Sequence, residues 1–150
     1  MTGSALPHLP ERARDIARAV QRGDVSAEEI ARDALDRIAS RDAEIGAFTD
    51  VTAERALAEA RAVDSARAKG ATPGPLAGVP YAVKNLYDVA GLSTRAGSKI
   101  SAADPPKTAD ALLVARMAAA GAVLTGALNM GEYAYDFTGE NAHYGPSRNP

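Results

Sequence analysis

A loop dense in glycine and proline, "GATPGP" at residues 70–75, divides this 150-residue chain into two parts with different patterns. Before the loop, apolar residues recur at the spacing of three to four that is typical of amphipathic helices. After it, short apolar runs alternate with glycine-rich turns, which is typical of strands. The sequence therefore predicts a mainly helical part over residues 1–70 and an α/β part over residues 71–150, within one domain.

The helical part carries clear start and stop signals. An apolar stripe begins at Ala13 and stops at Gly23, a residue that commonly ends a helix. Ser26 and Glu29 have the spacing of a capping box, which starts a second helix that we expect to end at about Arg41. A short strand and a third helix follow, over residues 46–51 and 52–69.

The second part reads as strand, helix, strand. The expected elements are a strand over residues 79–85, a helix from about Asp110, a strand over 123–129 and a helical turn over 130–137. This order predicts a parallel pair of strands joined by a crossover. Pro80 lacks an N–H group, so its strand should lie at an edge or begin irregularly.

Composition excludes several classes of function. Apolar residues make up 46% and charged residues 24%, as in soluble globular domains, and the net charge of -2 does not favour nucleic acid as a partner. Neither a membrane span nor a signal peptide is evident, so we expect no membrane association and a cytoplasmic location. Without cysteine, and with His8 and His143 far apart, neither thiolate chemistry nor a metal site is expected.

Lys84 is the unusual residue of the first predicted strand. Alternation places Val79, Tyr81 and Val83 on one face and Lys84 beside Ala82 on the other. A lone lysine at a strand end usually keeps its ammonium in water. The alternative is a desolvated amine that accepts a proton near neutral pH.

Three ordered motifs bear on that choice. "GPLAGVPYAVKNLYDVAG", "AAAGAVLTGALNMGEYAY" and "ENAHYGPSRNP" together resemble the amidase signature family in order and spacing. The resemblance implies an α/β amidase signature fold, with a mixed central sheet flanked by helices, of which this chain is an N-terminal portion. It also implies an amidohydrolase that works through an acyl-enzyme without metal or organic cofactor.

The same resemblance assigns roles to residues. Lys84 would be the base of a Ser, cis-Ser, Lys triad, and both serines would lie a few residues beyond Pro150. Asn129 and Met130 would bind substrate, a small amide. The chain departs from many family members at Asn85, where they carry aspartate.

Within the family, the sequence around Asn85 most resembles the carboxybiuret hydrolase branch, which acts on urea-like amides. A related branch is the glutaminase subunit of glutamyl-tRNA amidotransferases. Both imply a small helical partner subunit, and a homo-oligomer is a further expectation. The alternative hypothesis, from another class of function, is that the chain is a non-catalytic binding or scaffold fragment.

Several residues keep two interpretations. Ser98 or Thr94 could pair with Lys84 as a nucleophile, although such clusters usually form turns. Asn129 at the end of its strand could instead be a helix cap, a common role for such a residue. Arg95 could bind a substrate carboxylate or lie in solvent. The aromatic side chains after the last strand are either pocket walls or packing: Tyr133, Tyr135 and Phe137.

Overall fold

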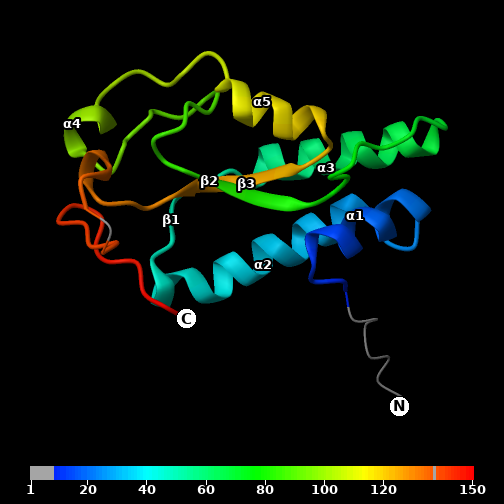
Figure 1. The fold of residues 1–150 in the computed structure, drawn as a ribbon, viewed down its shortest axis with the longest axis horizontal. Helices are drawn as coiled ribbons and strands as arrows, with labels where there is room; N and C mark the ends of the chain where they lie inside the picture. Colours follow the sequence, from blue (N-terminus) through cyan, green and yellow to red (C-terminus); the bar gives the residue numbers. More distant parts are fainter. Residues whose placement is uncertain (1–8, 137) are drawn as a thin grey trace.

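A mixed three-stranded sheet lies between helices in the computed structural model, which describes residues 9–136 and 138–150 (Figure 1). The strand order is β1-β3-β2; β2 runs parallel to β3 and β1 antiparallel. The strands are β1 (Phe48–Val51), β2 (Pro80–Lys84) and β3 (Val123–Leu128). The helices are α1 (Ala13–Arg22), α2 (Ala27–Ile45), α3 (Ala53–Ala68), α4 (Lys99–Ala102), α5 (Leu112–Ala119) and the 3-10 turn η1 (Glu132–Ala134).

Capping fixes the N-terminal helices as the sequence predicts. Gly23 ends α1 in the left-handed conformation, at a φ of 82°. Ser26 and Glu29 form the expected capping box at the start of α2. The expected end of α2 near Arg41 is wrong, because the helix continues to Ile45 and stops where Gly46 takes a φ of 68°.

The parallel strand pair is confirmed, and β2 is an edge strand that begins at Pro80, as expected. β1 comes from the first seventy residues and pairs with β3, so the helical and α/β parts share one sheet. The expectation that Val79 shares a face with Tyr81 and Val83 is wrong. Val79 precedes the strand, in a turn where its N–H donates to the carbonyl of Leu76, so strand alternation does not yet apply to it.

Each face of the sheet has its own core. Val79 and Val123 pack with buried residues of α1, α2 and α3, whereas Leu124 packs with Val89 and Val114 on the side of α5. In Figure 1, α5 accordingly lies on one side of the strands and α1 and α2 on the other. Tyr81 and Val83 join the α5 side.

The crossover from β2 to β3 contains one element that the sequence did not predict, the short helix α4, which Ser98 caps. The crossover is anchored before α5 begins. Arg55 of α3 makes two hydrogen bonds to the carboxylate of Asp110, at 2.8 and 2.7 Å, and Asp110 also accepts from the N–H of Ala90. This contact ties the loop before α5 to α3.

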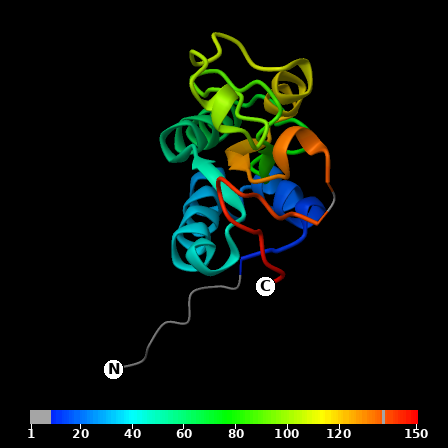
Figure 2. The same cartoon turned by 90° about the vertical axis from the view of Figure 1, so that its left-hand side faces the viewer.

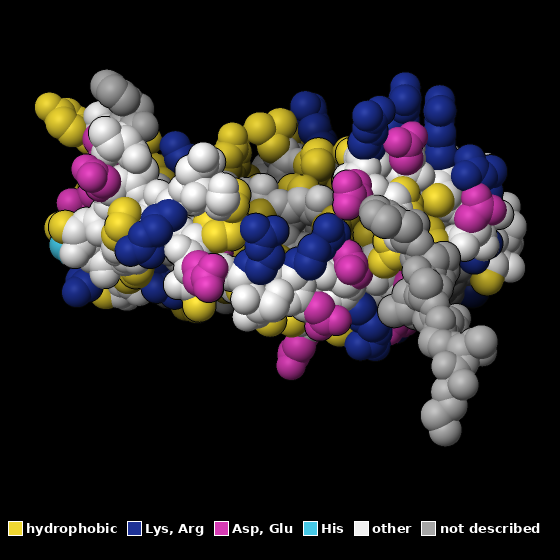
Figure 3. Space-filling model, turned by 90° about the horizontal axis from the view of Figure 1, so that it is seen from below, with side chains coloured by type: hydrophobic (Ala, Val, Ile, Leu, Met, Phe, Trp, Pro, Cys, Tyr) yellow, Lys and Arg dark blue, Asp and Glu magenta, His cyan; other side chains and the backbone are white. Residues whose placement is uncertain are grey.

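Side chains of both charges are interspersed over the lower face of the molecule, which α1 and α2 form (Figure 3). Several ion pairs lie on these helices, among them Arg32 with Glu28 and Arg37 with Asp33. Across residues 9–136 and 138–150, none of the helices has the length and apolar content needed to cross a membrane.

Candidate active site

The parallel pair brings two of the predicted site residues to one edge of the sheet. Lys84, the last residue of β2, pairs in register with Leu128, the last residue of β3, and Asn129 follows directly. Carboxyl ends of parallel strands are where α/β folds commonly bind ligands. Figure 2 looks toward this edge, where α4, η1 and residues 138–150 also gather.

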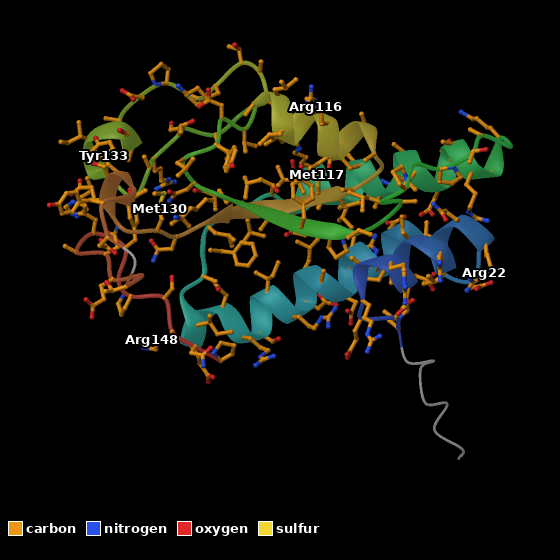
Figure 4. The ribbon with its side chains drawn as sticks, in the orientation of Figure 1. Arg22, Arg116, Met117, Met130, Tyr133 and Arg148 are labelled. Atoms are coloured by element: carbon orange, nitrogen blue, oxygen red, sulfur yellow. The ribbon has the colours of Figure 1, made fainter. Side chains whose placement is uncertain are left out.

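The side chain of Lys84 is exposed and lines a groove of about 440 Å³ between β2 and α5. The walls of this groove include Tyr81, Val83, Tyr87, Val114 and Met117. Met117 lies between α5 and the strands (Figure 4). In the described residues the Lys84 side chain is thus solvated, and the desolvated interpretation stays a prediction for the whole protein. Among the described residues, none hydrogen-bonds to the Lys84 ammonium, which meets water beside an apolar wall.

Asn85, directly after the lysine, is buried with only 2% of its surface exposed. Its Oδ1 accepts from the N–H of Gly97 at 3.0 Å, and its Nδ2 donates to the hydroxyl of Thr49 at 3.2 Å. Its own N–H donates to the carbonyl of Leu128. Asn85 therefore joins the end of β2 to β1, to β3 and to the loop before α4, a role that sequence reasoning missed.

Asn129 makes its contacts with the protein backbone. Its Nδ2 donates to the carbonyl of Gly145 at 2.9 Å, and its Oδ1 accepts from the N–H of Met130 at 2.9 Å. Met130 is buried, and its carbonyl accepts from Nδ2 of Asn141 at 2.7 Å. Both residues directly follow β3 at the sheet edge where β2 ends with Lys84, and Met130 is labelled in Figure 4. Their role in substrate binding stays a prediction.

The alternative nucleophiles have other partners. Ser98 is fully buried, and its Oγ accepts from the N–H of Ile100 at the start of α4. Thr94 donates to the carboxylate of Asp88. Within the described residues, neither hydroxyl contacts Lys84, so the geometry favours capping and turn roles over a Ser-Lys dyad.

Arg95 is half-buried and has partners within the chain. One guanidinium nitrogen lies 2.7 Å from Oδ1 of Asp50, and the group stacks 5.7 Å from the ring centre of Tyr144. Burial opposes protonation of Arg95, but Tyr144 and Asp50 outweigh it and raise the pKa. Arg95 therefore ties the loop before α4 to β1.

A second, wider cavity of about 910 Å³ lies beside η1 and residues 138–146. Tyr133 and Tyr135 line it and are largely exposed, which supports the pocket interpretation; Phe137 lies outside the described residues. Glu132 also lines it, 3.4 Å from His143. A hydrogen bond from Ser98 lowers the pKa of Glu132, desolvation opposes it to a lesser extent, and His143 lowers the pKa further.

Backbone strain is concentrated at this edge. Ala96 and Tyr133 take left-handed conformations, with φ of 47° and 51°, and the N–H of Tyr133 donates to the carbonyl of Ala96 at 2.8 Å. Strain of this kind in residues other than glycine is often found at functional sites. Across the described ranges, His, Asp and Glu do not form a group of three or more that could hold a metal ion.

Comparison with known proteins gives one family. The amidase family model matches residues 29–150. The chain is 55% identical, over 91% of its length, to AtzE, a 1-carboxybiuret hydrolase subunit of Pseudomonas sp. strain ADP, and covers 30% of that protein. It is 44% identical, over 92% of its length, to the A subunit of the glutamyl-tRNA(Gln) amidotransferase of Moorella thermoacetica, and covers 28% of it.

Solved structures show the same fold. A protein described as part of a vestigial complex that reveals the origins of an s-triazine catabolic enzyme superposes with a TM-score of 0.92 at 54% identity, over 93% of this chain and 31% of that one. The peptide amidase of Stenotrophomonas maltophilia superposes with a TM-score of 0.83 at 30% identity, over 95% and 30%. The chain thus spans about three tenths of the length of the relatives it matches.

Proposed function

This chain belongs to the amidase family, and we propose that it supplies the general base, Lys84, of an enzyme that hydrolyses C–N bonds in small urea-like or carboxamide molecules. The observation that carries the proposal is the place of Lys84. It is the last residue of a strand in a parallel pair, it lines a groove, and Asn129 and Met130 lie at the same edge.

The proposed reaction uses a Ser, cis-Ser, Lys triad whose two serines belong to the polypeptide that follows Pro150 in the whole protein. One serine oxygen attacks the amide carbon and forms a C–O bond, while its proton passes through the second serine to the Lys84 amine. The C–N bond then breaks, and the leaving nitrogen takes that proton. Water hydrolyses the acyl-enzyme and restores the serine.

A lysine accepts a proton only as the neutral amine, whereas Lys84 is exposed to water in the described residues. We therefore propose that the part of the whole protein outside these residues covers the groove between β2 and α5 and removes water from Lys84. The apolar walls of the groove support this, because Tyr81, Val114 and Met117 line the same groove as the lysine. In such a setting burial favours the neutral amine.

The substrate class follows from the relatives. The identity of 55% to a 1-carboxybiuret hydrolase subunit favours a urea-like amide, and the identity of 44% to the A subunit of an amidotransferase supports glutamine as the second candidate. Because the first of these relatives is one subunit of its enzyme, and because a similar structure is described as a complex, we also propose a partner protein for the whole enzyme.

Ammonia release by the whole protein tests this function. Purified enzyme is assayed with biuret and with glutamine, each with and without a serine-directed fluorophosphonate. We expect turnover of biuret that the fluorophosphonate abolishes, because the acyl-enzyme forms on serine. Turnover of glutamine alone would favour the glutaminase function. Absence of turnover and of fluorophosphonate labelling would favour the scaffold alternative.

A further inference from the structure

The backbone of Gly97 is held by two buried asparagines at the carboxyl edge of the sheet, one at its N–H and one at its carbonyl. Its N–H donates to Oδ1 of Asn85 at 3.0 Å, and its carbonyl accepts from Nδ2 of Asn141 at 2.7 Å. Asn85 is 2% exposed and Asn141 is 7% exposed. Buried amides are costly unless they are hydrogen-bonded, and each side-chain amide atom of this pair has a partner. We call Asn85, Gly97 and Asn141 the asparagine bridge.

One end of the bridge determines where the chain places Lys84. Asn85 follows the lysine, donates its N–H to the carbonyl of Leu128 at 2.9 Å and accepts at its own carbonyl from the N–H of Ala96 at 3.0 Å. Its side chain adds the bond to Thr49. Since no described residue hydrogen-bonds to the Lys84 ammonium, the lysine is positioned through its backbone rather than through its side chain.

The other end fixes the last described segment. Nδ2 of Asn141 also donates to the carbonyl of Met130 at 2.7 Å, and its Oδ1 accepts from the N–H groups of His143 and Tyr144. Farther along, the N–H of Arg148 donates to the carbonyl of Ile45 at 2.7 Å. Residues 141–148 are therefore held at both ends.

Glycine is required in the middle of the bridge. Gly97 has a φ of +72°, which side chains rarely allow, and a Cβ there would lie 2.7 Å from the carbonyl oxygen of Met130. The close approach lets the two asparagines reach the N–H and the carbonyl of one residue. A larger residue would separate the loop before α4 from Met130.

We propose that the asparagine bridge sets the distance between Lys84 and residues 141–150, and that Asn85 and Asn141 are positioning residues of the amidase reaction. The inference rests on the proposed function, because it assigns the bridge a purpose in that reaction. Small errors in placing a catalytic group cost a large part of the rate, so a rigid, fully hydrogen-bonded link is suited to this task.

The test uses the whole enzyme with Asn85→Ala, Asn141→Asp and Asn85→Asp. Asn85→Ala removes the acceptor for the Gly97 N–H, and Asn141→Asp removes the donor to the Gly97 carbonyl. Asn85→Asp keeps an acceptor for the N–H. Thr125→Val is the matched control, because it removes another buried hydrogen bond between β3 and β2, from Thr125 Oγ1 to the carbonyl of Tyr81. For each variant we measure kcat and KM for biuret or glutamine, whichever the wild type hydrolyses. The thermal midpoint of unfolding is measured beside them, so that a loss of rate can be told from a loss of stability.

We expect Asn85→Ala and Asn141→Asp to lower kcat by roughly 10- to 100-fold with little change in KM. Asn85→Asp, measured at its own optimal pH, should recover most of kcat, and Thr125→Val should keep it despite a similar loss of thermal stability. Equal kcat losses in Thr125→Val and Asn85→Ala, or an unchanged kcat in Asn85→Ala, would overturn the inference.

Hydrogen exchange separates this inference from the proposed function. The N–H of Gly97 should exchange faster in Asn85→Ala than in wild type, and at the wild-type rate in Thr125→Val. If Lys84→Met keeps full turnover, the proposed function fails while the exchange result still reports on the bridge. If exchange at Gly97 is the same in all variants, the bridge itself is refuted.

Discussion

Single residues at this site act through contacts that are distant in sequence. Asn85 bonds to Thr49, 36 positions earlier, and to Gly97, 12 positions later. Contacts between residues so distant in sequence produce no periodic pattern. The motifs therefore single out Lys84 but do not predict the hydrogen bonds of Asn85 beside it. The exposure of Lys84 depends likewise on what packs over the groove, which local sequence does not specify.

Aspartate at position 85 should shift the pH dependence of the whole enzyme. In Asn85→Asp the carboxylate can still accept from Gly97, and the Thr49 hydroxyl can turn from its present acceptor, the carbonyl of Ala127, to donate to it. The added negative charge favours the protonated form of Lys84, so the neutral base appears only at higher pH. We expect the acidic limb of kcat/KM against pH to move upward, and a downward shift would contradict this electrostatic account.

Whole elements are placed by a small number of polar contacts between layers. Asp110 is the clearest case, because its bonds to Arg55 and to the N–H of Ala90 hold the loop that leads into α5. The hydrogen bond from Arg55 lowers the pKa of Asp110, against a smaller opposing effect of burial. A carboxyl whose pKa is lowered on folding stabilises the fold above its unfolded pKa, and this stabilisation is lost as pH falls through its folded value.

Asp110→Asn should therefore destabilise the whole protein at neutral pH by about 1.5–3 kcal/mol, the usual contribution of a hydrogen bond to a charged group. The difference from wild type should shrink as the pH falls below the ordinary range of an aspartate. Urea unfolding of wild type and variant at pH 7 and at acidic pH measures the difference in free energy of unfolding under each condition. Asp33→Asn, on the exposed face of α2, is the control. If Asp110→Asn lost the same free energy of unfolding at both pH values, the stabilising role of the ionised Asp110 would be refuted.

Elements with strong local signals were the predictable ones. The capping box of Ser26 and the glycine after α1 located those helices, and the strand, helix, strand order gave the parallel pair. The end of α2 was misplaced although Gly46 was a usable signal. The helix α4 was missed because its four residues carry little periodicity and Ser98 reads equally as a turn residue.

At the scale of the whole molecule, this part of the chain leaves apolar surface beside its edge strand. Leu112 and Leu113 on α5 are 66% and 54% exposed, and Leu86 after β2 is 39% exposed. Exposed edges and apolar patches favour association. The family relatives are about three times as long, which fits a larger fold built around this sheet.

Residues 1–150 alone should accordingly release no ammonia from biuret or glutamine and should associate as concentration rises. The reason is that we propose both the catalytic serines and the cover of the groove to lie in the rest of the whole protein. Light scattering and an ammonia assay measure the two properties. Turnover by this portion that Ser98→Ala abolishes would instead establish the Ser98–Lys84 dyad.

The most direct test of the account is amide turnover by the whole enzyme with Lys84→Met, which keeps the length of the side chain and removes the amine. Lys99→Met, at an exposed lysine of α4, is the control. We expect Lys84→Met to lose at least roughly 100-fold in kcat, the lower range for a general base, with a denaturant midpoint equal to or above that of wild type. Turnover near the wild-type rate would show that Lys84 is not the base, and an inactive but strongly destabilised variant would make it a paired structural cation.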